Sequence, residues 1–284
     1  MKPIKDRHGR GLAIALYGAD GEILRLDAAR LEAALRLKRA LPGKPVLCAR
    51  ALEKLFGLVP VRLEVGLWNG KKISFHVSAD LGNFINDIDC LIVRDQYNAA
   101  KVKGGLVADA GANIGVFSLY ARALGAKKVY AYEPVKETFE LLKANLVLNR
   151  AGAAIKAVNI ALGKEKGQAE IQFNTRGEGS AMIKGAGVEV NRAVVYSGRR
   201  FVPVAPLDSL VKGRLDFIKM DVEGYEANVL LGAAGLIRKY KPVLSFSAYH
   251  RKADKKELPK TVAVIRPDYA ITLNTFAEHD FYCD

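Results

Sequence analysis

Glycines and acids follow two neighbouring apolar segments near the middle of the chain. The sequence Val-Ala-Asp-Ala-Gly-Ala-Asn-Ile-Gly over residues 107–115 predicts a buried strand that ends in a glycine turn and opens a helix. Eighteen residues after Gly115, a second strand predicted over residues 128–132 is followed by Glu133. A strand, a glycine turn, a helix and a second strand closed by an acid are typical of a site that binds a nucleoside cofactor.

The residues of the turn distinguish between nucleoside cofactors. The dinucleotide pattern requires glycine at two positions where this chain has Asn113 and Val116, and the Gly-Lys-Ser/Thr ending of a phosphate-binding P-loop is missing. Asp109, just before the turn, would repel a bound pyrophosphate. S-adenosylmethionine carries a sulfonium and an ammonium group and no phosphate, so we expect this cofactor, with Glu133 accepting hydrogen bonds from its ribose hydroxyls. The alternative is a purely structural turn.

A second acidic sequence, Asp-Val-Glu-Gly-Tyr-Glu over residues 221–226, follows the apolar segment 215–220. Ligands bind at the carboxyl ends of the strands in open parallel sheets, so Asp221 should lie at the same edge as the first glycine turn. Alternation along an extended segment places Asp221 and Glu223 on one side, where two carboxylates repel and one pKa rises. Glu226 is better explained by the positive end of the helix that follows.

His250 follows another predicted strand, over residues 242–247, and therefore reaches the same edge. Because imidazole titrates near neutral pH, we expect His250 or Asp221 to remove a proton from a hydroxyl acceptor while Glu223 orients that acceptor. A surface histidine beside cationic neighbours is the equal alternative. Asp221, Glu223 and His250 could supply oxygen and imidazole ligands to a metal, but their spacing is no metal signature, so the sequence assigns no metal ligand and leaves open whether a metal assists.

Strand and helix patterns alternate from residue 105 onward, which predicts an α/β fold with a mostly parallel sheet and helices on both faces. The expected strands cover residues 105–109, 128–132, 155–160, 215–221, 242–247, 269–273 and 281–283. The expected helices cover residues 114–124, 135–149 and a segment ending near 239. A hairpin-like pair, 169–173 and 201–204, interrupts the alternation around a polar, glycine-rich segment at 174–198.

We expect two parts in the chain: an N-terminal appendage over residues 1–98, able to cap a substrate, and a cofactor-binding domain over residues 99–284. Within the appendage, the patterns predict helices at 28–41 and 49–58, a hairpin at 61–77 and a helical or irregular link at 80–97.

Composition restricts the class of protein. Half of the 284 residues are hydrophobic, but the apolar runs are shorter than the ~20 residues that a membrane helix needs. No signal peptide is recognisable, so we expect a cytoplasmic protein. The three cysteines are far apart and predict neither disulfides nor a zinc site. A net charge of +14 favours anionic partners such as nucleic acid or phosphorylated sugars, or else solubilises the surface.

Together these motifs resemble the FkbM family of S-adenosylmethionine-dependent methyltransferases. The resemblance covers about residues 80–250 and is carried by residues 107–115, 132–134, 142–149, 207–210 and 217–226. It implies a class I Rossmann-like fold with a seven-stranded sheet and O-methylation of a hydroxyl, often on a sugar or a natural product. An RNA methyltransferase and a non-catalytic cofactor-binding protein are the alternatives, and no RNA-binding module is recognisable.

The resemblance also implies roles for individual residues. The residues expected to hold the cofactor are Asp109, Gly111, Asn113, Gly115 and Glu133. Ala161, just after the third strand, would lie by the adenine, and Tyr97 would approach the methionine end of the cofactor.

Overall fold

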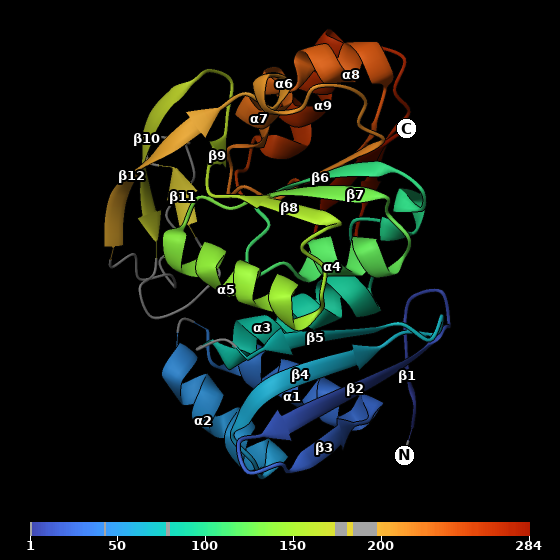
Figure 1. Ribbon diagram of the computed structural model, residues 1–284, viewed down its shortest axis with the longest axis vertical. Coiled ribbons are helices and arrows are strands. Elements are labelled where there is room, and N and C mark those ends of the chain that lie inside the picture. Colours follow the sequence, from blue (N-terminus) through green and yellow to red (C-terminus); the bar gives the residue numbers. More distant parts are fainter. Residues whose placement is uncertain (1, 43, 78–79, 174–180, 184–197) are drawn as a thin grey trace.

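The computed structural model describes residues 2–42, 44–77, 80–173, 181–183 and 198–284. Its larger part is built on a seven-stranded sheet with the order β15-β16-β14-β13-β6-β7-β8 (Figure 1). The strands are β6 (Leu106–Ala110), β7 (Lys128–Tyr132), β8 (Ile155–Val158), β13 (Phe217–Met220), β14 (Val243–Ser247), β15 (Ile271–Asn274) and β16 (Asp280–Cys283). Only β16 runs antiparallel to its neighbours β14 and β15. The predicted class I Rossmann-like fold with a mostly parallel sheet is therefore confirmed.

Both faces of this sheet are apolar, as its strand sequences require. Val107 and Phe217 belong to the hydrophobic cluster on one face, whereas Ala108 and Ile218 belong to the cluster on the other. Helices α4 (Val116–Ala123) and α5 (Lys136–Leu148) cover the first face (Figure 1). The second face is covered by α6 (Leu207–Leu210), α7 (Glu226–Gly232), α8 (Ala234–Tyr240) and α9 (Asp254–Ile265).

The N-terminal part contains more strands than we expected. Its five-stranded antiparallel sheet consists of β1 (Ile4–Lys5), β2 (Gly11–Gly18), β3 (Ile23–Leu26), β4 (Pro60–Gly66) and β5 (Lys72–His76). The predicted hairpin is confirmed as β4 and β5, but the expectation of only a small hairpin is wrong. Strand β2 was missed because Ala13 and Ala15 stand between Leu12, Ile14 and Leu16, so that the alternation of apolar and polar residues is hidden.

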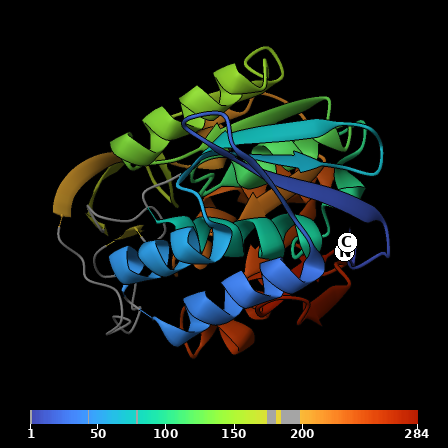
Figure 2. The same cartoon turned by 90° about the horizontal axis from the view of Figure 1, so that it is seen from below.

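The predicted helices of this part are confirmed as α1 (Ala28–Ala40) and α2 (Pro45–Phe56). The predicted link contains α3 (Leu81–Ile88) and a π-helical turn over Asp89–Val93, and a 3-10 turn follows over Ala99–Val102. Seen from below, α1 and α2 lie side by side (Figure 2). A single hydrophobic cluster joins this part to the seven-stranded sheet, so apolar contacts cross the boundary expected at residue 98. The division of the chain at that residue stays a prediction.

A small sheet with the order β11-β10-β12-β9 stands beside the main one. The predicted hairpin-like pair is confirmed as β10 (Gly167–Phe173) and β12 (Gly198–Ala205). The third predicted strand ends early, at Val158, and β9 (Ala161–Leu162) pairs with β12 instead. Apart from β11 (Ala181–Ile183) and Gly198, the predicted glycine-rich segment lies outside the described residues.

Two further differences concern helices. The predicted helix ending near residue 239 is divided into α7 and α8 at Ala233. Helix α9 was not predicted, because it has Pro259 in its interior and begins within a run of charged residues. Across the described part of the chain, we find no helix with the length and hydropathy required to span a membrane.

Asn145 of α5 connects the two large sheets. Its Oδ1 accepts a hydrogen bond from the backbone N–H of His76 at 2.9 Å, on the outer edge of β5. Its Nδ2 donates to the carbonyl oxygen of Ile114 in the glycine turn, also at 2.9 Å. Asn149 forms a similar pair of bonds with the backbone N–H and carbonyl of Ser74. The two asparagines of α5 thus provide hydrogen-bond partners for backbone groups on the outer edge of β5, which has no neighbouring strand on that side among the described residues.

We expect Asn145→Ala to lower the free energy of unfolding by about 2–3 kcal/mol, because it leaves a backbone donor and a backbone acceptor without partners. Urea denaturation would measure this loss. Val147→Ala on the same helix is the control, since the Val147 side chain is 78% exposed and its removal should change stability by less than about 0.5 kcal/mol. Equal effects of the two substitutions would contradict the role of Asn145.

Candidate functional site

The glycine turn joins the two sequence motifs. Gly111 follows β6 with a φ of 73°, and the backbone N–H groups of Gly111 and Ala112 both donate to the carbonyl of Tyr132, at 3.1 and 2.9 Å. A Cβ atom on Gly111 would collide with the carbonyl oxygen of Asp221. The turn after β6 and the turn after β13 can therefore approach this closely only because residue 111 is glycine.

Glu133 lies at the end of β7, beside this turn. Its Oε2 accepts a hydrogen bond from the backbone N–H of Asn113 at 3.0 Å, and its Oε1 accepts one from Val135 at 2.9 Å. Burial raises the pKa of Glu133 to about 7, although these two hydrogen bonds act in the opposite direction. Asn113 has a φ of 49°, which aims its N–H at Glu133. The Oδ1 atom of Asn113 is buried without a hydrogen-bond partner among the described residues.

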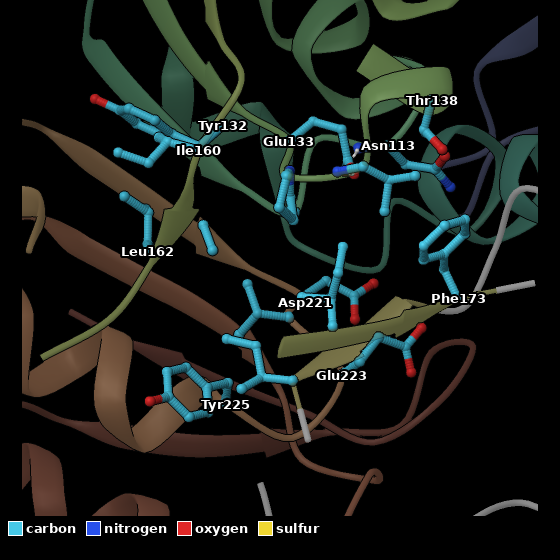
Figure 3. Close-up of a pocket in the computed structure, with 17 residues that line it drawn as sticks. Asn113, Tyr132, Glu133, Thr138, Ile160, Leu162, Phe173, Asp221, Glu223 and Tyr225 are labelled. Atoms are coloured by element: carbon cyan, nitrogen blue, oxygen red, sulfur yellow. Dashed lines mark hydrogen bonds between the residues drawn. The ribbon is translucent and has the colours of Figure 1, made fainter. Parts of the chain in front are cut away.

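A cavity opens between these two turns (Figure 3). Six of the residues singled out from the sequence line it: Gly111, Asn113, Glu133, Ala161, Asp221 and Glu223. Ala161 lies between Ile160 and Leu162, which add an apolar wall, and Phe173 and Tyr225 add aromatic side chains. The cavity therefore combines an apolar side with three carboxylates.

The other four predicted residues, which lie outside the cavity wall, are Asp109, Gly115, Tyr97 and His250. Asp109 is completely buried beneath the glycine turn, where it accepts a hydrogen bond from Ser118 Oγ at 2.6 Å and pairs with Lys219 Nζ at 3.1 Å. Gly115 begins α4 and packs against Leu142. Lys219 was not predicted as a site residue, although a lysine in the middle of an apolar strand was a usable signal that it had a buried partner.

Tyr97 is buried and connects the N-terminal link to the second motif. Its hydroxyl donates to Asp221 Oδ2 at 2.9 Å and lies 2.7 Å from the Oγ atom of Ser247, at the end of β14. Tyr97 therefore orients Asp221 from behind, while the Asp221 side chain, 29% exposed, reaches the cavity.

His250 lies among the carboxyl groups of Asp221, Glu223 and Glu226. Its proximity to Asp221 and Glu223 agrees with the prediction that these residues reach the same edge of the sheet. Its Nδ1 is 3.1 Å from Glu226 Oε1, and its Nε2 is 3.5 Å from both Asp221 Oδ1 and Glu223 Oε2. Glu226 is the first residue of α7 and accepts hydrogen bonds from the backbone N–H groups of Val222 and Gly224. The expectation that Glu226 stabilises the start of a helix is consistent with these bonds, but its contact with His250 was missed.

We call the group formed by Asp221, Glu223, Glu226 and His250 the acid–histidine cluster. The charges of its members influence one another. Burial alone would lower the pKa of His250, but the hydrogen bond that it donates to Glu226 and the nearby carboxylates raise it to about 10. Burial raises the pKa of Glu223 to about 8, with repulsion from Asp221 adding to the effect. Burial would also raise the pKa of Asp221, yet the positive charge of Lys219 and of His250 holds it below its ordinary value. At neutral pH, His250 is therefore cationic.

Comparison with known proteins identifies the family. The sequence profile of the methyltransferase FkbM domain matches residues 109–282, which is more than half of the chain. The chain belongs to this family. The resemblance that the two acidic motifs suggested is thereby confirmed.

Individual relatives are more distant. Methyltransferase sdnD of Sordaria araneosa is 30% identical over 153 residues, a match that spans 44% of this chain and 59% of that protein. The solved methyltransferase FkbM of Methylobacillus flagellatus KT has 20% identity and a TM-score of 0.48, over 74% of this chain and 56% of that chain. A putative rRNA methylase from Clostridium thermocellum has 6% identity and a TM-score of 0.43, over 67% and 90% of the two chains.

The contact between the two turns can be tested with Gly111→Ala. We expect this variant to lose about 1–3 kcal/mol more stability than Gly104→Ala, which serves as the control. Both glycines have a φ near 75°, but Gly104 has no atom within 4 Å of an added Cβ, so it reports only the backbone strain of about 1–2 kcal/mol. Urea denaturation measures both, and equal losses would contradict a close approach at Gly111.

The buried carboxyl of Glu133 predicts a pH dependence of stability. Its pKa is about 7 in the fold against 4.5 ordinarily, so its contribution is fully present below pH 4.5 and is lost as the pH rises through 7. The difference in unfolding free energy between the wild type and Glu133→Gln should therefore fall by on the order of 3 kcal/mol over this range. Urea denaturation at several pH values tests this, and a difference that does not vary with pH would refute it.

Proposed function

We propose that this protein is an S-adenosylmethionine-dependent O-methyltransferase that acts on a hydroxyl of a sugar, a glycolipid or another small molecule. One observation carries the proposal: Glu133 and Asp221, one from each sequence motif, line the same cavity. A nucleoside-binding acid and a proton-accepting acid thus face a common space. Membership in the FkbM family supports methyl transfer as the reaction.

The residues of the cavity fit the cofactor. The unpartnered Oδ1 of Asn113 offers a hydrogen-bond acceptor, and the carboxylate of Glu133 suits a pair of ribose hydroxyls. Ile160, Ala161 and Leu162 provide the apolar wall that a flat purine requires. When bound, S-adenosylmethionine supplies a methyl group activated by its sulfonium, which leaves as a neutral thioether.

The acid–histidine cluster would serve the acceptor. As the acceptor oxygen forms its bond to the methyl carbon and the carbon–sulfur bond breaks, the hydroxyl proton must leave, and we assign it to the carboxylate of Asp221, while Glu223 orients the acceptor. Both side chains line the cavity and are 28–29% exposed, whereas His250 is 6% exposed and lies behind them. His250 is therefore proposed as a positioning residue that holds these two carboxylates.

The charge of the cavity supports an acceptor that is neutral at its reacting end. Among the described residues that line it are Glu133, Asp221 and Glu223, and none is lysine or arginine. The ionised carboxylate of Asp221, with no lysine or arginine on the described wall to offset it, would repel a phosphate close to the methyl group. This disfavours RNA and phosphorylated sugars, despite the net charge of +14.

Calorimetry with S-adenosylmethionine, followed by transfer of a labelled methyl group to glycans, lipids and RNA, tests the proposal. We expect Glu133→Gln to weaken cofactor binding. We expect Asp221→Asn to bind the cofactor normally but to lower kcat by about 10²–10⁴-fold, because proton removal is lost. His250→Gln should lower kcat more than it changes KM. Glu140→Gln, an exposed acid on α5, is the control and should match the wild type.

The outcomes separate the three functions considered from the sequence. Transfer to a sugar or lipid hydroxyl that Asp221→Asn abolishes would support the proposal. Salt-sensitive transfer to RNA would overturn it in favour of an RNA methyltransferase. Cofactor binding without transfer to any acceptor would overturn it in favour of a non-catalytic protein.

A further inference from the structure

Both ring nitrogens of His250 face carboxylates. Nδ1 is 3.1 Å from Glu226 Oε1, and Nε2 is 3.5 Å from Asp221 Oδ1 and from Glu223 Oε2. A neutral imidazole has only one N–H group, so one nitrogen would direct its lone pair at an anion. The 3.5 Å separations also exceed the 2.7–3.2 Å typical of a hydrogen bond. These groups therefore favour a positive charge, which the second proton of a cationic His250 supplies and which a metal cation bound to one ring nitrogen would supply in its place.

Glu226 provides a second, independent observation. Its side chain is completely buried, and its Oε1 already serves Val222, Gly224 and His250. Its Oε2 is buried and has no hydrogen-bond partner among the described residues. A buried carboxylate oxygen without a partner is costly in a folded protein, so an oxygen in this position points to a ligand.

We propose that Asp221, Glu226 and His250 bind a divalent metal cation. One possible ligand atom from each of these residues lies within 4.8 Å of the others. Two ligands on opposite sides of a divalent cation are about 4.2–4.4 Å apart, so small side-chain rotations would close the site. Two carboxylate oxygens and one imidazole nitrogen suit Mn²⁺ or a similar first-row ion, with Mg²⁺ as a harder alternative.

The site would leave coordination positions open toward the cavity, because Asp221 also lines it. This role rests on the proposed function: a hydroxyl coordinated to the cation would lose its proton more readily. Glu223 lines the cavity and is not one of the three ligands, and the charge of the nearby cation would favour its ionised form, which would then receive that proton. The metal would thereby fix the acceptor oxygen next to the acids that serve it.

Binding of Mn²⁺ to the 284-residue chain, without cofactor or acceptor, tests the site directly. We expect calorimetry and the electron paramagnetic resonance signal of free Mn²⁺ to show one bound ion per chain. Asp221→Asn, Glu226→Gln and His250→Gln should each weaken Mn²⁺ binding at least about tenfold. Glu140→Gln and His76→Gln remove an exposed acid and an exposed histidine of other elements, and both should bind Mn²⁺ like the wild type.

Glu226 also holds two backbone N–H groups, so circular dichroism must establish that Glu226→Gln folds. If it does not, the partly exposed Asp221 keeps the test decisive through Asp221→Asn. Absence of Mn²⁺ binding, or equal binding by Asp221→Asn and the wild type, would overturn the site. Full transfer activity in a chelator would overturn its role and leave the methyltransferase proposal intact. Mn²⁺ binding at these residues without any methyl transfer would support the site and overturn that proposal instead.

Discussion

The buried ion pair between Lys219 and Asp109 determines how the site is assembled. The two residues face each other in register on the central strands β13 and β6, and they are 3% and 0% exposed. Each charge alone would be very costly in this core, so the fold must form both strands in this register to pair them. Lys219 Nζ also donates to the carbonyl of Gly111 at 2.7 Å. One ammonium group thereby fixes the end of β6 and the start of the glycine turn.

The same lysine connects the two halves of the site. Its positive charge helps to hold the pKa of Asp221 down, so that a carboxylate stays ionised next to Glu223 and Glu226. Tyr97 and Phe117 lie over its ammonium group, with ring centres 5.5 and 6.0 Å away. The two rings cover the buried ammonium group, and the hydroxyl of Tyr97 orients Asp221. The cofactor turn and the acid–histidine cluster therefore depend on one buried charge rather than on two separate supports.

Sequence patterns could predict which residues reach the active edge of the sheet but not how they pair. Asp109 was expected to face the cofactor because it precedes the glycine turn, yet it is buried and paired with Lys219. The distinction depends on which side of the strand each residue faces and on the register of β6 against β13, which a single sequence does not show. The contact between Glu226 and His250 joins residues 24 positions apart on two different elements. The distance in space between these two side chains is set only by how the two elements pack in the fold.

The opposite charges of the surface and the cavity have different consequences. An excess of 14 positive charges acts over roughly a Debye length of 8–10 Å and is screened by salt. The ionised carboxylate of Asp221 acts across the cavity itself, over only a few ångströms. Within a few ångströms of the reacting atoms, the local acids therefore outweigh the net charge. The basic surface describes how the chain meets other molecules, whereas the chemistry of the acceptor must be inferred from the cavity.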